Sequence, residues 1–316
     1  MRRFRFSTAL LFVSLLHPLQ VFSKGDSDAL SAQVVKKKPT SDEPVASAKK
    51  QTDNSESKSD RSAPAIHAAS AVVVDAQSGK LLYALNPDEQ RAVASTQKLM
   101  TALLVTESGS LDKIIKIEAS DTWAEPSKLD IAAGETYRKG DLLRILMVKS
   151  MNDVARALAR DTGGSIEGFA KKMNAKAEEL GMTNSHFVNP NGLPAKDQYS
   201  TARDMSKVAI AAYRNKAIRE AVRLKELSWQ DPDGDVTVFH NTNRVLSSLE
   251  CCNGMKTGYT VAAGFCLVSS ASLNGRDVIA VVLGDKKEFI WKDSQNLLSW
   301  ALGLPVSGVP VASSKR

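Results

Sequence analysis

The sequence predicts an α+β fold in which both ends of the folded region supply strands to one antiparallel sheet, with a helical lobe between them. Alternating apolar residues over 70–85, interrupted at Ser78–Gly79, predict a β-hairpin. Helical spacing of apolar residues then recurs between residues 96 and 215. Strand patterns return after Trp229 and precede one last helix. We therefore expect a cleft where the sheet meets the helical lobe.

Local signals place the individual elements. The helices of the lobe are expected at 96–109, 140–150, 153–161, 165–181 and 201–215. Gly181 is expected to end the fourth of these helices. The Pro- and Asn-rich stretch 187–200 is expected to be a loop. The later strands are expected within 235–243, 254–260, 264–273 and 276–284, and the closing helix at 287–302. Asn274–Gly275 is a strong signal for the turn of a hairpin.

The N-terminal region differs from the rest of the chain. Residues 1–23 combine a basic start with a short apolar stretch, which is typical of a signal peptide for export to the periplasm or cell envelope. An uncleaved N-terminal anchor is the alternative. Residues 24–63 contain no aromatic residue and predict a disordered tether. The catalytic domain is expected at 64–305, with a short tail at 306–316, and no later segment is apolar for long enough to insert stably into a membrane.

The net charge of +7 is spread unevenly along the chain. Residues 1–23 carry +3, residues 24–63 carry +1, and residues 64–316 carry the remaining +3. The folded part is thus nearly balanced, and a nucleic-acid partner is not indicated.

Three cysteines, Cys251, Cys252 and Cys266, have a spacing that fits no zinc pattern. In the expected hairpin Cys266 falls opposite about Thr257, several residues from Cys252, so a disulfide would need unsuitable geometry. We expect free thiols, mostly buried, and no metal or cofactor.

The pattern Ser-x-x-Lys is a candidate for a nucleophile with its base, and it occurs at Ser47/Lys50, Ser55/Lys58, Ser95/Lys98 and Ser110/Lys113. The first two copies lie in the tether, where a lysine cannot be desolvated against a serine, and the last lies in a polar turn. Ser95 and Lys98 start an apolar helix, where both share one face and burial can lower the lysine pKa. Taken alone, this pair is better explained as a helix N-cap followed by a solvated lysine.

Two further motifs favour the catalytic interpretation. Ser150-x-Asn152 lies at a junction between two predicted helices, whereas the other Ser-x-Asn copies, at Ser272 and Ser294, fall in a hairpin turn and in the closing helix. Lys256-Thr257-Gly258 occurs once, on a predicted strand. Three motifs in this order, each on a suitable element, are far more specific than any one of them.

The set resembles the motifs of the penicillin-recognising serine peptidases and class A β-lactamases. Longer stretches, "VVVDAQSGKLLYALNPDEQRAVASTQKLMTALLV", "FVNPNGLP" and "GMKTGYTVAAGFCLV", are similar to the low-molecular-mass D-alanyl-D-alanine peptidases of the bacterial cell wall. The resemblance covers about residues 65–305. It implies a β-lactamase/transpeptidase-like fold with a five-stranded antiparallel sheet. It also implies a serine enzyme that acts on peptidoglycan stem peptides and is inhibited by β-lactams.

The resemblance also implies a role for each motif residue. Ser95 matches the nucleophile and Lys98 the base that takes its proton. Ser150 matches a hydroxyl that relays a proton to the leaving amine, and Asn152 matches an amide that holds the substrate backbone.

The third motif matches the substrate-binding strand. Lys256 corresponds to a second lysine, whose charge helps to keep Lys98 neutral and attracts a carboxylate. Thr257 corresponds to the hydroxyl that contacts this carboxylate, and Gly258 completes the substrate-binding set. The N–H groups of Ser95 and Tyr259 correspond to the oxyanion hole.

Alternatives from other classes remain open. A Ser-His-Asp hydrolase would have to use His67, His186 or His240, and no Gly-x-Ser-x-Gly occurs. A β-lactamase would need a loop glutamate, yet Asp197 is the only acidic residue between Gly181 and Arg203, so we expect slow release of penicillin. A non-catalytic peptidoglycan-binding protein is the third possibility.

The length of the chain after the closing helix bears on which bond the enzyme would cleave. Only about 14 residues follow the closing helix, which favours the short, single-domain endopeptidase type over carboxypeptidases with an additional C-terminal domain. The preference between carboxypeptidase and endopeptidase activity stays open at this point.

Overall fold

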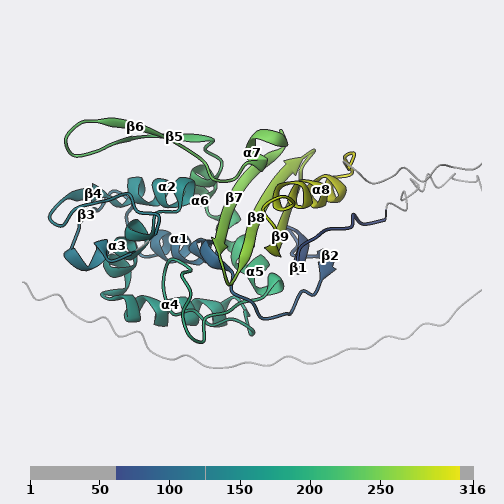
Figure 1. The fold of residues 1–316 in the computed structure, drawn as a ribbon, viewed down its shortest axis with the longest axis horizontal. Helices are drawn as coiled ribbons and strands as arrows, with labels where there is room; N and C mark the ends of the chain where they lie inside the picture. Colours follow the sequence, from purple (N-terminus) through teal and green to yellow (C-terminus); the bar gives the residue numbers. More distant parts are fainter. Residues whose placement is uncertain (1–61, 125, 307–316) are drawn as a thin grey trace, which may run out of the picture. The chain divides into compact units, whose positions relative to one another are not determined.

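A computed structural model of the protein describes residues 62–124 and 126–306. The main sheet is antiparallel and has five strands in the order β2-β1-β9-β8-β7 (Figure 1). The N-terminal part of the folded region supplies β1 (Ser70–Asp75) and β2 (Leu81–Leu85). The C-terminal part supplies β7 (Cys252–Thr260), β8 (Gly264–Leu273) and β9 (Arg276–Asp285). The predicted α+β sheet built from both ends of the folded region is thus confirmed.

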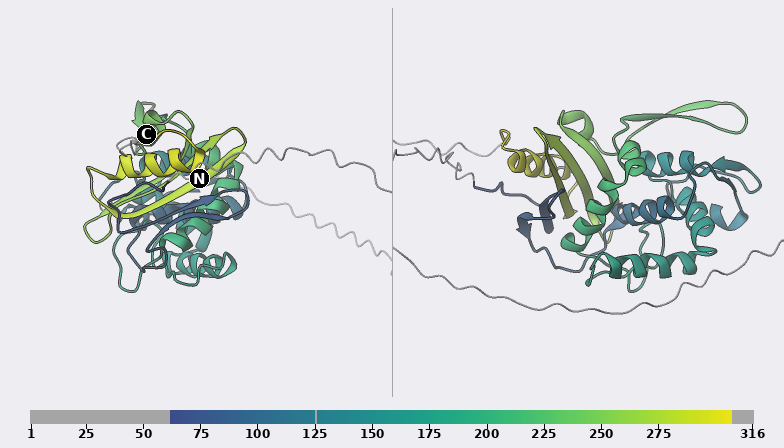
Figure 2. Two further views of the ribbon diagram at one scale, coloured as in Figure 1. Left: turned by 90° about the vertical axis from the view of Figure 1, so that its right-hand side faces the viewer. Right: turned by 180° about the vertical axis from the view of Figure 1, so that it is seen from behind.

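The sheet is covered on both faces. The closing helix α8 (Ile290–Leu302) packs on one face, and α5 (Ala202–Arg214) packs on the other (Figures 1 and 2). Along β1, Ala71 and Val73 belong to the core under α8, whereas Val72 and Val74 belong to the core shared with the helical lobe. Successive strand residues point to opposite faces, so a strand buried on both sides reads as a continuous apolar run.

The helical lobe surrounds α1 (Lys98–Glu107), eight of whose ten residues are buried. Such a helix must be enclosed by other elements, because it has no face left for water. The helices that enclose it are α2 (Lys139–Lys149), α3 (Asn152–Gly163), α4 (Ile166–Glu179), α5 and α6 (Lys216–Val222). The five helices predicted for the lobe are all present, and α6 is an addition that the sequence did not reveal.

Two small hairpins complete the lobe. One pairs β3 (Ile114–Lys116) with β4 (Thr136–Arg138), and the other pairs β5 (Glu226–Gln230) with β6 (Val236–His240). The β5–β6 hairpin extends away from the helices at the upper left of Figure 1. The short segments η2 (Ala119–Thr122) and α7 (Val245–Ser248) lie in the connections. Of these four strands only β6 was predicted, because its β-branched residues Val236, Thr237 and Val238 give it a strand signal of its own.

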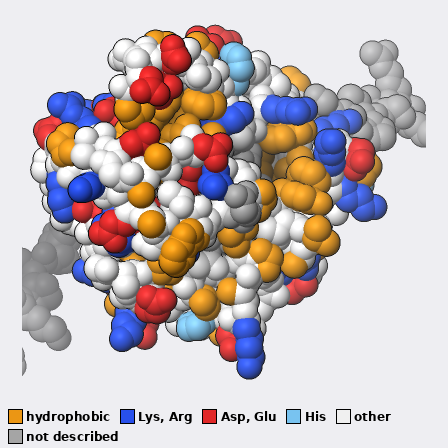
Figure 3. All heavy atoms as spheres, turned by 60° about the vertical axis from the view of Figure 1, so that its left-hand side comes forward, with side chains coloured by type: hydrophobic (Ala, Val, Ile, Leu, Met, Phe, Trp, Pro, Cys, Tyr) orange, Lys and Arg blue, Asp and Glu red, His pale blue; other side chains and the backbone are white. Residues whose placement is uncertain are grey.

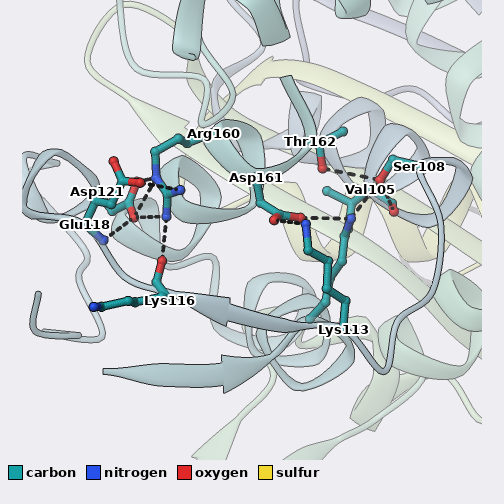
Figure 4. A network of polar contacts seen from close by, with 10 residues as sticks. Val105, Ser108, Lys113, Lys116, Glu118, Asp121, Arg160, Asp161 and Thr162 are labelled. Atoms are coloured by element: carbon teal, nitrogen blue, oxygen red, sulfur yellow. Dashed lines mark hydrogen bonds and ion pairs between the residues drawn. The ribbon is translucent and has the colours of Figure 1, made fainter. Parts of the chain in front are cut away.

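Two ion-pair clusters tie α3 to its neighbours in the lobe (Figure 4). Arg160 binds Asp121 through two nitrogen atoms and also pairs with Glu118. Asp161 pairs with Lys113 at 2.5 Å and with Lys139 at 3.2 Å. Both ends of η2 and the start of β3 are therefore held against the outer surface of α3.

Charged side chains of both signs are interspersed on the face shown in Figure 3. This distribution agrees with the small net charge predicted for residues 64–316.

The cysteines are free, as predicted. Cys266 lies opposite Gly258, one residue from the predicted Thr257, and Cys252 lies opposite Ala271. Burial raises the pKa of both Cys252 and Cys266 to about 11, so these two thiols are unreactive near neutral pH. Cys251 is only partly buried.

The termini extend beyond the described residues. The predicted signal peptide at 1–23, all but two residues of the predicted tether at 24–63, and all but one residue of the predicted tail at 306–316 lie outside them. Within the described ranges, no helix is both long enough and apolar enough to cross a membrane.

The loop at 187–200 is held to α4 by one side chain. Asn174 accepts a hydrogen bond from Phe187 N at 2.8 Å and donates one to Phe187 O at 2.8 Å. The Asn174 amide thus satisfies both backbone groups of a residue that is 1% exposed.

We predict that Asn174→Ala lowers the free energy of unfolding by about 2 kcal/mol, because two hydrogen bonds worth about 1 kcal/mol each are lost. Urea unfolding followed by circular dichroism measures the change. Asn174→Asp is the control, since it keeps the acceptor for Phe187 N and should lose less. Equal unfolding midpoints for Asn174→Ala and the wild type would contradict the prediction.

Candidate active site

Ser95 and Lys98 lie side by side where the chain enters α1. Ser95 belongs to a short 3-10 turn, η1 (Ala94–Gln97), and Lys98 is the first residue of α1. The predicted single helix is therefore divided, yet the two side chains still meet, with Lys98 Nζ 2.9 Å from Ser95 Oγ. Ser95 is partly buried and Lys98 is fully buried, so the interpretation of Lys98 as a solvated lysine is wrong.

Lys98 Nζ has two further oxygen neighbours, Asn152 Oδ1 and Asn191 O, each at 2.7 Å. A neutral amine has two N–H groups and one lone pair. The two oxygens can accept both N–H groups, which leaves the lone pair directed at the hydroxyl of Ser95. This arrangement suits an amine that takes a proton from the serine.

The environment also favours the neutral form of this amine. Burial, and secondly the charge of Lys256, hold the pKa of Lys98 well below its usual range. The predicted influence of Lys256 is therefore present, although desolvation is the larger cause.

Ser150 and Asn152 lie at the junction between α2 and α3, as predicted. Ser150 ends α2 in a left-handed conformation, with φ of 70°, and Asn152 begins α3. The Asn152 amide is 4% exposed; its oxygen accepts from Lys98 and its nitrogen donates to Pro126 O at 2.5 Å. The Ser150 hydroxyl is partly buried and has no hydrogen-bond partner in the part of the chain that the structure describes.

The third motif lies on the edge strand β7. Lys256 is fully buried, and this burial lowers its pKa to about 7. The Thr257 hydroxyl donates to Thr242 Oγ1 at 2.7 Å, and Tyr259 is 56% exposed. A lysine that carries a charge only below about pH 7 and an adjacent hydroxyl can together receive a carboxylate.

Gly258 lets β7 approach the turn that carries Ser95. A Cβ atom at this position would lie 2.8 Å from Ser95 N and 3.0 Å from Thr96 N. Any larger residue would therefore push the strand away from the serine. The backbone at Gly258 lies against the Ser95 N–H, one of the two predicted oxyanion donors, and the role of the Tyr259 N–H stays a prediction.

The loop after α4 supplies a group that the sequence analysis did not assign. Asn191 presents its carbonyl oxygen to Lys98 and also lies 3.2 Å from Ser95 Oγ. Gly192 has φ of 82°, and a Cβ atom there would lie 2.1 Å from Ala94 O. The "NPNG" run predicted only a loop, since a backbone carbonyl carries no sequence signal of its own.

Side chains of the same loop hold this carbonyl in place. Asn189 Oδ1 accepts from Gly192 N at 2.8 Å and from Asn191 N at 3.3 Å. Gln198 Oε1 accepts from Val188 N and Asn189 N, each at 3.0 Å. The position of the Asn191 carbonyl is thus over-determined by local hydrogen bonds.

The three histidines among the described residues have other partners. His67 stacks on Phe289 and contacts Asp293, His186 contacts the Asp197 carbonyl, and His240 lies near Glu226. None of them contacts Ser95 within the described residues, so a Ser-His-Asp arrangement is not formed around this serine. Nor do those residues include three or more His, Cys, Asp or Glu side chains grouped to hold a metal ion.

Comparison with known proteins identifies the family. The family model for D-alanyl-D-alanine carboxypeptidase matches residues 57–287. The chain is 34% identical over 262 residues to the D-alanyl-D-alanine endopeptidase of Escherichia coli, which covers 80% of this chain and 83% of that protein. It is 36% identical over 222 residues to the carboxypeptidase DacF of Bacillus subtilis, which covers 69% of this chain and 57% of that protein.

Solved structures show the same relationship. The carboxypeptidase DacD from Francisella tularensis superimposes with a TM-score of 0.72 at 30% identity, covering 76% of this chain and 71% of that one. A D-alanyl-D-alanine carboxypeptidase from Mycobacterium tuberculosis gives a TM-score of 0.74 at 28% identity, covering 79% and 96%.

The predicted fold and family are both confirmed, because the family match spans most of the described chain and the solved relatives share its architecture. The chain belongs to the D-alanyl-D-alanine carboxypeptidase family of serine peptidases and has the transpeptidase-type fold of that family.

Proposed function

We propose that this protein is a serine D,D-peptidase that cleaves peptidoglycan stem peptides through an acyl-enzyme on Ser95. The observation that carries the proposal is the buried Lys98 amine, which lies 2.9 Å from Ser95 Oγ and has two oxygen acceptors for its N–H groups. Burial favours the neutral form of this amine, which is oriented by its acceptors and lies within reach of the hydroxyl proton. A non-catalytic peptidoglycan-binding protein would have no need to bury a lysine in this way.

The reaction follows from this geometry. Lys98 takes the proton of Ser95 as Oγ attacks the carbonyl carbon of the penultimate D-alanine. The oxyanion that forms is stabilised by the N–H groups of Ser95 and Tyr259. The proton then passes through the Ser150 hydroxyl to the leaving amine, and the scissile C–N bond breaks. A water molecule then takes the place of the amine and attacks the acyl ester on Ser95. The proton transfers run in the opposite direction, and the Ser95 hydroxyl is restored.

The substrate lies between the motifs. Lys256, when charged, attracts the carboxylate of the terminal residue, and Thr257 donates a hydrogen bond to it. Asn152 holds the substrate backbone on the opposite wall, and Gly258 keeps β7 close to Ser95. The peptide is extended along β7, which is an edge strand with room for an added strand.

We further propose that cross-link cleavage is the main activity. The relatives from Escherichia coli and Pseudomonas aeruginosa that are named endopeptidases match over 83% and 80% of their lengths. Digestion of purified muropeptides tests this proposal. Equal molar amounts of monomeric pentapeptide and cross-linked dimer are supplied together, and faster loss of the dimer is expected. Preferential release of D-alanine from the pentapeptide would instead identify a carboxypeptidase.

The envelope is the proposed location. Residues 1–23 serve as the signal peptide, residues 24–63 as a tether, residues 64–305 as the catalytic domain, and residues 306–316 as a tail. β-Lactams act as inhibitors because their strained amide acylates Ser95. Their release is slow, because the loop at 187–200 has no glutamate to activate a deacylating water.

We predict that Ser95→Ala abolishes labelling by a fluorescent penicillin and cleavage of muropeptides, because the acyl-forming oxygen is removed. Ser110→Ala is a matched control from the other Ser-x-x-Lys copy in the folded domain, where Lys113 pairs with Asp161 and Ser110 is exposed. It should leave both readouts unchanged. Equal activity of Ser95→Ala and wild type would refute the mechanism, and loss of the label from wild type within seconds would favour a β-lactamase.

The pKa of Lys256 predicts a pH dependence. Its pKa of about 7 lies below the ordinary value, so the side chain is charged below pH 7 and neutral above it. The KM for a substrate with a terminal carboxylate should therefore rise about tenfold per pH unit above pH 7, while kcat stays nearly constant because bound substrate keeps Lys256 protonated.

Steady-state kinetics between about pH 6 and about pH 9, a range that includes the pKa of Lys256, measure this effect. Lys256→Arg is the control, since arginine stays charged throughout and should remove the rise in KM. A KM that is independent of pH in the wild type would contradict the assigned role of Lys256.

A further inference from the structure

A short segment folds around the N-terminal end of α3, beside the candidate site. Asn152 N donates to Ser127 O at 2.8 Å, and the Asn152 side chain donates to Pro126 O at 2.5 Å. Ser127 and Asp130 both have positive φ, at 63°. We name residues 126–131 the wall segment. Its carbonyl groups hold the main chain and the amide nitrogen of Asn152.

The other half of the wall segment is held by the residue that follows Asn152. Asp153 is fully buried, and its carboxylate accepts from Leu129 N at 3.0 Å and from Asp130 N at 2.9 Å. It also accepts from the Val154 N–H at 2.8 Å, in the first turn of α3. One carboxylate thus joins the wall segment to the helix end that carries Asn152.

Backbone N–H groups hold the carboxylate of Asp153. It accepts from the main chain of Leu129, Asp130 and Val154. A carboxylate buried among backbone donors costs desolvation energy, which is offset only if the donors stay in place. The wall segment and Asp153 therefore hold each other.

We infer that Asp153 is a positioning residue that orients the Asn152 amide through the wall segment. With Asp153 in place, Pro126 O accepts from Asn152 Nδ2, so Asn152 Oδ1 must face Lys98. Without the anchor, the wall segment moves away and the amide is free to rotate. The Lys98 amine then loses one of the two acceptors that direct its lone pair. This inference rests on the proposed acyl-transfer function of Ser95 and Lys98.

The kinetic test uses Asp153→Asn, which keeps the size of the side chain but places an amide NH₂ where only acceptors fit. We expect the second-order rate of acylation by a fluorescent penicillin to fall about tenfold or more, because small displacements of catalytic groups have effects of this size. Asp161→Asn is the matched control. It removes a carboxylate from the same helix about 12 Å further along, at the ion pairs shown in Figure 4, and should leave the rate per folded molecule unchanged.

A double-mutant cycle separates positioning from a general structural role. Because Asp153 acts through Asn152, the pair Asn152→Ala/Asp153→Asn should acylate no more slowly than Asn152→Ala alone. Rate losses that multiply in the double variant would overturn the inference, as would an unchanged rate in Asp153→Asn.

Two measurements do not depend on activity, and the first of them needs only the wild-type protein. In the wild type, the amides of Leu129 and Asp130 should exchange with deuterium as slowly as those in the first turn of α3. In folded Asp153→Asn, trypsin should cut after Lys128 faster than in the wild type or in Asp161→Asn. Exchange of both amides at loop rates would refute the anchoring. If the two amides exchange slowly but penicillin does not label the wild type, the anchoring by Asp153 is supported and the proposed function is refuted.

Discussion

The buried amine of Lys98 is the constraint on which the rest of the structure depends. A lysine buried inside a protein is tolerated only when it is neutral or fully paired, and Lys98 Nζ has three oxygen partners. The helix that carries it is enclosed on nearly all sides, which is why the lobe needs so many helices around α1. Burial also favours the neutral amine, which can act as a base. The desolvation cost of Lys98 and its catalytic role therefore have the same physical cause.

Two of the three partners of Lys98 come from distant parts of the chain. Ser95 lies one turn away, Asn152 is 54 residues further on, and Asn191 is 93 residues further on. Each is held by its own supports: Gly258 packs against the serine turn, the wall segment holds Asn152, and the loop side chain of Asn189 holds the backbone at Asn191. The site is therefore as rigid as the contacts between these separate elements.

Much of the fold was predictable because its elements have strong local signals. The β8–β9 hairpin, with its Asn274–Gly275 turn, and the amphipathic helix α5 were placed to within one or two residues. The strands β3, β4 and β5 and the helix α6 were missed, because they are short and depend on neighbours rather than on their own pattern. The motif residues were found from spacing and order, whereas Asn191 and Asp153 act on or through backbone groups, which leave no motif.

The sequence by itself determined the family, the order of the main-sheet strands and of the longer helices, and the residues that carry the three motifs, since these depend on residue identity and periodicity. Only the tertiary structure decided that Lys98 is fully buried, that its amine lies beside Ser95 Oγ, and that Gly258 must be small. Those properties depend on which atoms enclose a group. The enclosing atoms come from segments far apart in the chain, so no local pattern encodes them.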